Sequence, residues 1–281
     1  MVIDSHTHIF PDPVAQKAIP ELAALLKARP AMDGTVNGLL ESMENGDIDI
    51  SIVLPIVTHP HQFDSILRFA VHLNETYSAG RRRIHSLASV HPLEPAFAEQ
   101  LRLIRREGFT GIKIHPPYQG VELNDIRYKR IIEKASELGL SVTTHAGFDV
   151  YCPHHNYCSV DMILEVLHDV APPALVAAHL GNNSYYDEVE KKLCGQNLYF
   201  DTAYSILHIS ETQLAGIIRQ HGADKVLFAT DVPWADQKAS VERLRNLPGL
   251  SPEEKERLLF RNAASLYHLD TGNASKAGEP A

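Results

Sequence analysis

The chain has 281 residues, of which 44% are hydrophobic and 22% charged, which is ordinary for a globular protein with a full-sized core. Its 26 lysines and arginines against 35 acidic residues give a formal net charge of −9, which excludes a broadly cationic surface for nucleic acid. The 3 cysteines cannot all pair, which favours a reducing compartment. No apolar run approaches the roughly 18 residues of a membrane span, and the N-terminus reads as a strand rather than a signal peptide. We therefore expect a cytoplasmic protein with no nucleic-acid or membrane partner.

Short apolar or β-branched segments predict eight strands, at Val2–His8, Ile50–Ile56, Ile84–Val90, Gly111–His115, Ser141–His145, Leu175–His179, Leu198–Thr202 and Val226–Thr230. Amphipathic segments between them predict helices at Ser65–Tyr77, Ala96–Glu107, Ile126–Leu138, Val160–Asp169 and Glu211–His221. Such alternation indicates parallel strands with right-handed crossovers, and eight units most economically close into one (β/α)₈ TIM barrel. The competing doubly wound sheet normally has a glycine-rich turn after its first strand. Here the turn from Thr7 to Pro11 has no glycine, so the barrel is preferred.

The ends of the barrel are also predicted. The segment from Ile9 to Asp49 is longer than a crossover, and we expect two helices there, with a loop near Pro30–Gly34, as a helical insertion over the barrel mouth. A helix near Pro252–Tyr267 should close the barrel. Residues 1–269 would then form a single domain, and the polar segment Asp270–Ala281 is expected to be a flexible tail.

Histidines, of which the chain has 16, gather with other polar residues where the predicted strands end. The side-chain period of a strand places His6 and His8 on one side of the first strand, and two such imidazoles are a natural ligand pair for a divalent cation. A single buried histidine is ordinarily a hydrogen-bonded core residue. That explanation does not account for imidazoles at the ends of four strands that surround one cavity. Asp201, where the seventh strand ends, could orient a neighbouring ligand.

Several short motifs occur together in one order, from Val2 to about Leu269. They are Ile3–His8, Gly111–Pro116, His145–Gly147, Ala178–Gly181, Phe228–Trp234 and Arg261–Ala263. With these motifs the chain resembles the amidohydrolase superfamily, and within it the amidohydrolase-related branch of metal-dependent TIM-barrel hydrolases. That branch also contains decarboxylases of the carboxymuconate-semialdehyde and resorcylate types.

The resemblance implies one divalent metal ion, zinc with manganese as the alternative, held by His6, His8, His145 and Asp231. A bound zinc ion lowers the pKa of its water to about 7. Asp231 would accept the proton of that water and later deliver it to the leaving group, and His179 would orient the water or polarise the substrate. In binuclear relatives a lysine at the position of Lys113 is carbamylated and bridges two metal ions. We expect the mononuclear form, since most of this branch is mononuclear.

The predicted mouth loops suggest the kind of substrate. Those after strands two to eight contain no lysine or arginine, whereas phosphate and multi-carboxylate substrates usually require arginine. We therefore expect a small organic substrate that is neutral or weakly charged. The predicted substrate-binding residues are Lys113, His115, Tyr118 and Trp234, the last two of which offer ring surfaces.

From these features we expect an enzyme that hydrolyses a C–N or C–O bond, in an amide, lactam, lactone or ester, through a metal-activated water. The alternative is non-oxidative decarboxylation of an aromatic or enol acid at the same site. A second alternative is a catalytically silent metal-binding scaffold, which the intact ligand set argues against. The Cys152–Cys158 loop could form an accessory zinc site, although the spacing of its two cysteines is wider than is usual for zinc ligands. A homodimer is the default oligomer.

Overall fold

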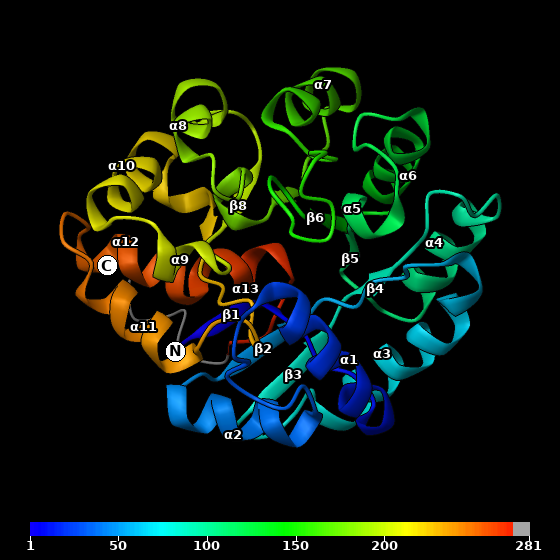
Figure 1. The fold of residues 1–281 in the computed structure, drawn as a ribbon, viewed down its shortest axis with the longest axis horizontal. Coiled ribbons are helices and arrows are strands. Elements are labelled where there is room, and N and C mark those ends of the chain that lie inside the picture. The colour runs from blue at the N-terminus through cyan, green and yellow to red at the C-terminus, as the bar shows by residue number, and fades with distance from the viewer. Residues whose placement is uncertain (272–281) are drawn as a thin grey trace, which may run out of the picture.

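The computed structural model describes residues 1–271, and its strands lie at the centre with the helices around them (Figure 1). The strands are β1 (Ile3–Thr7), β2 (Ile50–Val53), β3 (Arg83–Ser86), β4 (Ala88–Ser89), β5 (Gly111–Ile114), β6 (Ser141–Thr144), β7 (Leu175–Ala177), β8 (Tyr199–Asp201) and β9 (Val226–Leu227). Their pairing follows the order of the chain, β1 to β3 in one sheet and β4 to β9 in another, and every pair is parallel.

Hydrogen bonds bring the first and last strands together. The backbone N–H of Ser5 donates to the carbonyl of Phe228 (3.0 Å), that of Asp231 to His6 (2.9 Å) and that of His8 to Val232 (2.8 Å). These bonds join β1 to the segment that continues β9. The predicted α/β TIM barrel is confirmed.

The predicted third strand differs in one respect, because it is divided at Leu87 into β3 and β4. β3 pairs with β2, whereas β4 pairs with β5. At the division the side chain of Asn74 donates to the carbonyl of Ser86 (3.2 Å) and accepts its N–H (2.6 Å). The side-chain amide of Asn74 thus forms hydrogen bonds with the strand backbone at this point. The hydrophobic pattern of the segment itself does not predict the division.

The longer helices are α1 (Asp12–Leu26), α2 (Val36–Gly46), α3 (Phe63–Tyr77), α4 (Phe97–Arg106), α6 (Ile126–Glu137), α7 (Val160–Val170), α10 (Glu211–His221) and α11 (Gln237–Asn246). Shorter ones are η1 (Pro60–Gln62), α5 (Pro116–Gln119), η2 (His179–Gly181), α8 (Tyr186–Glu188), η3 (Val189–Leu193), α9 (Ser205–His208), η4 (Ala223–Lys225), α12 (Pro252–Glu256), η5 (Arg257–Arg261) and α13 (Asn262–Leu266). Side-chain caps begin many of them: Thr35, Asp125, Ser159 and Ser210 accept backbone N–H groups at the starts of α2, α6, α7 and α10. Such caps satisfy donors that a helix start leaves free.

The insertion after β1 has the two predicted helices, α1 and α2, on either side of the Pro30–Gly34 loop. The predicted C-terminal helix is also present, as the continuous run of α12, η5 and α13. Its Phe260 and Tyr267 pack with Ile3, Ile50 and other residues of the barrel interior, so the run closes one end of the barrel. The larger core lies between strands and helices. Of the predicted tail Asp270–Ala281, residues 272–281 lie outside the described residues.

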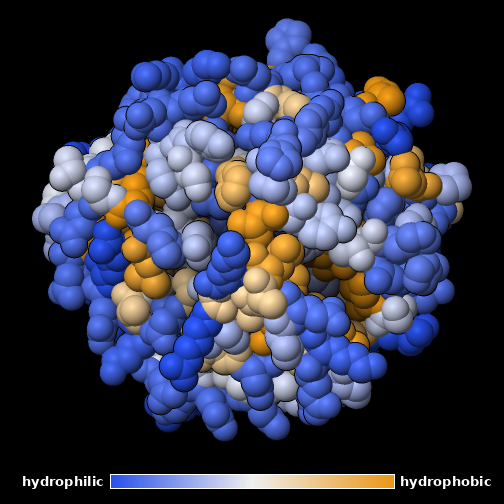
Figure 2. Space-filling model, viewed as in Figure 1, coloured by the Kyte–Doolittle hydropathy of each residue, from blue (hydrophilic) through white to orange (hydrophobic). Residues whose placement is uncertain are grey.

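The surface in the orientation of Figure 1 is hydrophilic around its edge, and hydrophobic residues gather nearer its centre (Figure 2). None of the helices in residues 1–271 has the length and apolar character needed to cross a membrane.

Candidate metal centre and active site

A cavity of about 210 Å³ lies where the strands end, and it collects the residues singled out from the sequence. Leu22 and Leu26 of α1 also line it, so the insertion covers part of the barrel mouth. Lys113 is the one lysine or arginine among the described lining residues. All predicted metal-ligating, catalytic and substrate-binding residues line this cavity: His6, His8, Lys113, His115, Tyr118, His145, His179, Asp231 and Trp234.

His6, His8 and Asp231 form the most compact polar group in the cavity. The Nε2 atoms of His6 and His8 are 3.1 Å apart. Oδ1 of Asp231 is 3.6 Å from Nε2 of His6 and 3.2 Å from Nε2 of His8. The ligand atoms of the three residues all lie within 4.8 Å of one another. Two imidazole nitrogens and a carboxylate at this spacing suit a divalent cation. These three residues are called the metal-type group below.

Hydrogen bonds on the far side of each ring decide which nitrogen carries the hydrogen. Nδ1 of His6 lies 2.8 Å from Oδ2 of Asp201, and Nδ1 of His8 lies 3.0 Å from the carbonyl oxygen of Leu54. Both partners accept, so each Nδ1 donates, and each ring in its neutral form keeps a lone pair on Nε2. Two lone pairs and a carboxylate oxygen would repel one another unless a cation lay between them. The arrangement therefore fits a metal ion, with ring orientations held by outer partners as is usual at metal sites.

Buried side chains also hold the backbone of this group in place. The carboxylate of Asp4 accepts the N–H and hydroxyl of Thr230 (2.9 and 2.5 Å) and the side-chain amide of Gln237 (2.7 Å). This ties β1 to the residue before Asp231. Asp231 has φ 71° and His179 has φ 57°, a conformation that costs about 1–3 kcal/mol in a residue other than glycine and is concentrated at functional sites.

The charge states in the group favour metal binding. Burial, with the charge of Lys113 nearby, lowers the pKa of His6 well below its usual value, so the ring is neutral at neutral pH. Burial by itself would raise the pKa of Asp231. Its contact with His8 and the nearby rings of His6 and His179 outweigh that effect, so its pKa lies below the usual value. Asp231 is therefore ionised, and the group presents the neutral ring of His6 and a carboxylate.

Lys113 lies beside this group. Its side chain is fully buried, and its Nζ is 3.3 Å from Nε2 of His6. Burial lowers the pKa of Lys113 to about 8, and no carboxylate within the described residues lies within 4.0 Å of its Nζ to form an ion pair. A lysine in this state has an appreciable neutral fraction near neutral pH.

His145 belongs to a neighbouring group rather than to the compact one. Its Nδ1 lies 3.1 Å from Nε2 of His179, whose Nδ1 donates to the carbonyl of Ala203 (3.0 Å). The ligand atoms that come within 4.8 Å of one another around His145 are those of His115 and Asp149. The four residues expected to hold one ion are thus divided between two adjacent groups, with His179 next to both His6 and His145.

Two positions of the candidate site stand out more clearly in the structure than in the sequence. Asp149 is one of many acidic residues in the predicted mouth loops, and only the structure places it between His115 and His145. Leu54 contributes a backbone carbonyl, for which no sequence signal exists. Within residues 1–271, the Cys152–Cys158 loop contributes neither to the metal-type group nor to the group of His115, His145 and Asp149.

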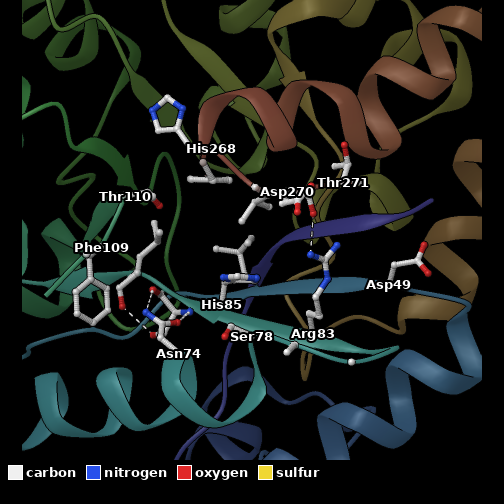
Figure 3. Close-up of a pocket in the computed structure, with 18 of the residues that line it drawn as sticks. Asp49, Asn74, Ser78, Arg83, His85, Phe109, Thr110, His268, Asp270 and Thr271 are labelled. Carbon is white, nitrogen blue, oxygen red and sulfur yellow. Dashed lines mark hydrogen bonds between the residues drawn. The ribbon is translucent and has the colours of Figure 1, made fainter. Parts of the chain in front are cut away.

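A larger cavity, of about 770 Å³, lies at the opposite ends of the strands (Figure 3). Its wall includes Asp49 and Arg83 at the starts of β2 and β3, and Arg83 donates to the carbonyl of Asp270 (2.7 Å). Chemistry in TIM barrels takes place at the C-terminal ends of the strands. The smaller cavity, which contains the imidazoles and Asp231, is therefore the candidate site.

Comparison with known proteins agrees with the fold. A family model described as amidohydrolase matches residues 3–269, whereas none of the curated proteins gives a significant match. The fold is similar to 5-carboxyvanillate decarboxylase from Sphingomonas paucimobilis, with a TM-score of 0.72 and 18% identity over 96% of this chain and 99% of that one. It is also similar to an uncharacterised TIM-barrel protein from Bordetella bronchiseptica (TM-score 0.74, 17% identity, 95% and 98% covered). A third similar structure is a dihydroxybenzoic acid decarboxylase from a Polaromonas species with bound manganese and 2-nitroresorcinol (TM-score 0.68, 15% identity, 97% and 98% covered).

Proposed function

The chain belongs to the amidohydrolase family, and from that premise we propose that it is a metal-dependent enzyme that removes the carboxyl group of a small aromatic or enol acid without oxidation. The proposal reverses the order of the two reactions expected from the sequence, in which hydrolysis came first. The reaction is that of the decarboxylases among the similar structures. Each of these matches covers nearly the whole of this chain and of the similar one.

The observation that carries the proposal is the size and polarity of the cavity. A cavity of 150 Å³ is known to hold benzene, so about 210 Å³ suits a single substituted ring. Aromatic and aliphatic side chains such as Phe10, Ile56 and Trp234 line it. Its one lysine or arginine among the described lining residues, Lys113, lies beside the metal-type group, where it would attract the carboxylate of an acid substrate.

In this proposal His6, His8 and Asp231 hold the metal ion, with His145 as the fourth ligand that the family resemblance implies. A bound zinc or manganese ion would draw electron density from substrate oxygens and so stabilise negative charge as the C–C bond breaks. Imidazole and carboxylate ligands suit both metals. The donor set therefore fits the family's cofactor and leaves the choice of metal to measurement.

Decarboxylation also needs a proton, because the carbon that loses CO₂ must gain hydrogen. Asp231 is ionised and lies at the metal-type group. It would take the proton from a hydroxyl group of the substrate and return it to that carbon as CO₂ leaves. His179 would position the imidazole of His145, because its Nε2 lies 3.1 Å from Nδ1 of that ring.

Hydrolysis of a C–N or C–O bond is the second candidate, and the ionised state of Asp231 favours it. A carboxylate that is ionised at neutral pH has the lone pairs needed to accept the proton of an attacking water. Lys113, if it reacts with CO₂ to form a carbamate, would add an anionic ligand near His6 and so favour a second metal ion. The buried, partly neutral Lys113 amine is compatible with that reaction.

One experiment distinguishes the two reactions. Metal-loaded protein is incubated with hydroxybenzoic acids, enol acids, lactones and amides, and released CO₂ and titratable acid are measured separately. The proposal expects CO₂ without net acid. Asp231→Asn should keep part of the metal and lose turnover by at least about 100-fold, while Asp187→Asn, at the exposed α8, should retain it. Acid without CO₂ would establish the hydrolase instead, and neither product from any compound would overturn both.

A further inference from the structure

Tyr204, which follows β8, has a backbone conformation that is rare for a large side chain. Its φ is 58° and its ψ −52°, and the N–H of Ser205 donates across it to the carbonyl of Ala203 (2.5 Å). A three-residue turn of this hand is strained in any residue that has a Cβ atom. The turn is also held from outside, because the N–H of Tyr204 donates to the carbonyl of Thr230 (2.9 Å), the residue before Asp231.

Most of the non-glycine residues with positive φ in residues 1–271 fall in two places. Some lie at the ends of α1, α2 and α7, where this conformation is ordinary. Others line the active-site cavity, and these are His179, Ser184, Tyr204 and Asp231. Strained backbone is concentrated at functional sites. In the order of the strands Tyr204 lies between His179 and Asp231, and the function proposed above does not use its side chain.

The side chain of Tyr204 is held at the cavity wall with its hydroxyl group unused. Its ring stacks on that of His208, with the centroids 4.1 Å apart and the planes at 27°. Within residues 1–271 the hydroxyl group forms no hydrogen bond with another residue. Burial raises the pKa of Tyr204 and the nearby charge of Asp231 raises it further. A phenol keeps its hydrogen at neutral pH, so the cavity has an unpaired donor near Asp231.

The reaction proposed for Asp231 creates a use for such a donor. When Asp231 takes the proton of a substrate hydroxyl group, the substrate oxygen gains negative charge. A hydrogen bond from a neutral hydroxyl group to that oxygen stabilises the charge, and its effect is largest where water is excluded. Tyr204 would keep its own hydrogen throughout, so the transfer from the substrate oxygen to Asp231 and on to carbon stays balanced.

We propose that Tyr204 is a substrate-binding residue whose hydroxyl group donates a hydrogen bond to the substrate oxygen that gives its proton to Asp231. The inference rests on the proposed function and adds the residue that holds this oxygen while the proton is on Asp231. The strained turn and the stacking on His208 fix the ring, so the donor is in place before the substrate binds.

The probe 4-nitrophenol tests the hydrogen bond without turnover. Its phenolate absorbs visible light, so absorbance of the complex with metal-loaded protein, followed against pH, gives the pKa of the bound probe. Tyr204→Phe keeps the ring and removes the donor. We expect it to bind the phenolate about 10-fold more weakly relative to the neutral phenol, and so to raise the pKa of the bound probe. Tyr185→Phe, the same change at a half-exposed residue, should leave that pKa unchanged.

Turnover separates the proposed role from simple packing. With any acid that releases CO₂, Tyr204→Phe should lower kcat about 100-fold and change KM by less than about 3-fold. The reason is that charge on the substrate oxygen develops only as the reaction proceeds. A ring that merely packs against His208 would leave both constants unchanged, because phenylalanine packs in the same way. Metal content and thermal unfolding show that the variant is folded and loaded.

Tyr204→Gly and Tyr204→Ala test the backbone separately from the side chain. Both remove the ring, but only glycine accepts φ 58° without strain. We expect a Tm about 2–4 °C higher for the glycine variant, although glycine is ordinarily the less stabilising of the two residues. An alanine variant that is equally or more stable would show that the turn is not strained and overturn the inference drawn from it.

The two proposals fail in distinguishable ways. An unchanged pKa of the bound probe together with an unchanged kcat in Tyr204→Phe would overturn the role of Tyr204 and leave the decarboxylase standing. A raised pKa of the bound probe in that variant, in a protein that releases CO₂ from no acid, would support the hydrogen bond and overturn the reaction. Absence of 4-nitrophenol binding by the unaltered, metal-loaded protein would overturn the inference.

Discussion

At the scale of single residues, the metal-type group depends on where two hydrogens lie. His6 and His8 can offer lone pairs from Nε2 because Asp201 and the carbonyl of Leu54 accept from their Nδ1 atoms. Asp201 also accepts the backbone N–H groups of His179 and Ala203 (2.8 and 3.1 Å). One buried carboxylate thus orients a ligand and shapes the turn that carries His179.

Asp201→Asn should weaken metal binding without removing any ligand. The amide of Asn would present N–H groups to Nδ1 of His6, which favours the hydrogen on Nε2 and removes the lone pair that the metal needs. We expect metal affinity to fall about 10–100-fold, the range for loss of such outer partners. Competition with a chelator measures it, and Asp187→Asn is the control for the same chemical change at an exposed site. Unchanged affinity would show that Asp201 does not set the state of His6.

At the scale of elements, the segment after β6 has to pass close to the segment after β7. Gly147, with φ 88°, pairs with Asn183 in an isolated bridge. A Cβ atom added to Gly147 would lie 2.1 Å from the backbone nitrogen of Asn183. This close passage directly precedes Asp149, so the position of Asp149 in the cavity wall depends on it.

Gly147→Ala should therefore destabilise the protein more than the same change at a glycine that is equally left-handed but uncrowded. Gly139 has φ 67° and nothing within 4 Å of an added Cβ. Gly139→Ala should cost about 1–2 kcal/mol of unfolding free energy, from conformation alone. Gly147→Ala should cost at least about 2 kcal/mol more, as backbone moves to relieve the overlap. Urea denaturation of both variants measures the difference, and equal losses would contradict the close approach.

Another element, α10, is joined to β8 through a buried histidine. His221 donates from Nε2 to the carbonyl of Leu198 (3.0 Å), accepts the N–H of Gly195 at Nδ1 (3.2 Å) and stacks on Phe200 at 3.9 Å. Burial lowers the pKa of His221 to about 4. Its pKa in the unfolded chain is the ordinary 6.5, so the unfolded state takes up the proton first. The free energy of unfolding is therefore highest above about pH 6.5, as far as His221 is concerned, and it decreases as the pH falls toward 4.

His221→Gln retains an acceptor and a donor but cannot be protonated. Its unfolding free energy should fall less between pH 6.5 and 4 than that of the unaltered protein, by about 2 kcal/mol. Denaturant titrations across that range measure the slope, with His154→Gln at the exposed mouth loop as the control. An acid slope equal to that of the unaltered protein would show that His221 is not responsible.

At the scale of the whole molecule, the metal-type group joins parts of the chain that are far apart. His6 lies in β1, His8 directly follows β1, and Asp231 follows β9. A metal ion held there would connect the first and last strands and would bind the folded chain in preference to the unfolded one.

Metal should therefore stabilise the fold measurably. At a free concentration about 100 times Kd, binding to the native state adds about 2.7 kcal/mol, which corresponds to a rise in Tm of roughly 5–10 °C for a chain of this size. Thermal unfolding with zinc, manganese or a chelator measures it, and the double variant His6→Ala with His8→Ala should show no rise. Elemental analysis should find one ion per chain. Two ions per chain would support a second metal ion bridged by a carbamylated Lys113. A Tm that does not change with metal would contradict a metal centre at His6, His8 and Asp231.

Local patterns in the sequence determine the barrel and the side of it where chemistry takes place. The alternation of apolar strands with amphipathic helices requires parallel pairing, and the two-residue period of β1 places His6 and His8 together. The helix α10 matches its prediction at both ends, Glu211 and His221, since a capping serine and a glycine mark them. The residues predicted for the site all line one cavity for the same reason, since the strand ends of a barrel converge.

Only the tertiary structure decided how those residues are grouped and protonated. His145 lies with His115 and Asp149 rather than within the compact group, and the division of the third strand depends on Asn74 of α3. The lone pairs of His6 and His8 depend on Asp201 and on a backbone carbonyl at Leu54. Such partners are far away along the chain and, for a carbonyl, independent of residue type. Periodicity reports which way a side chain points, whereas hydrogen-bond partners across the barrel decide what that side chain can do.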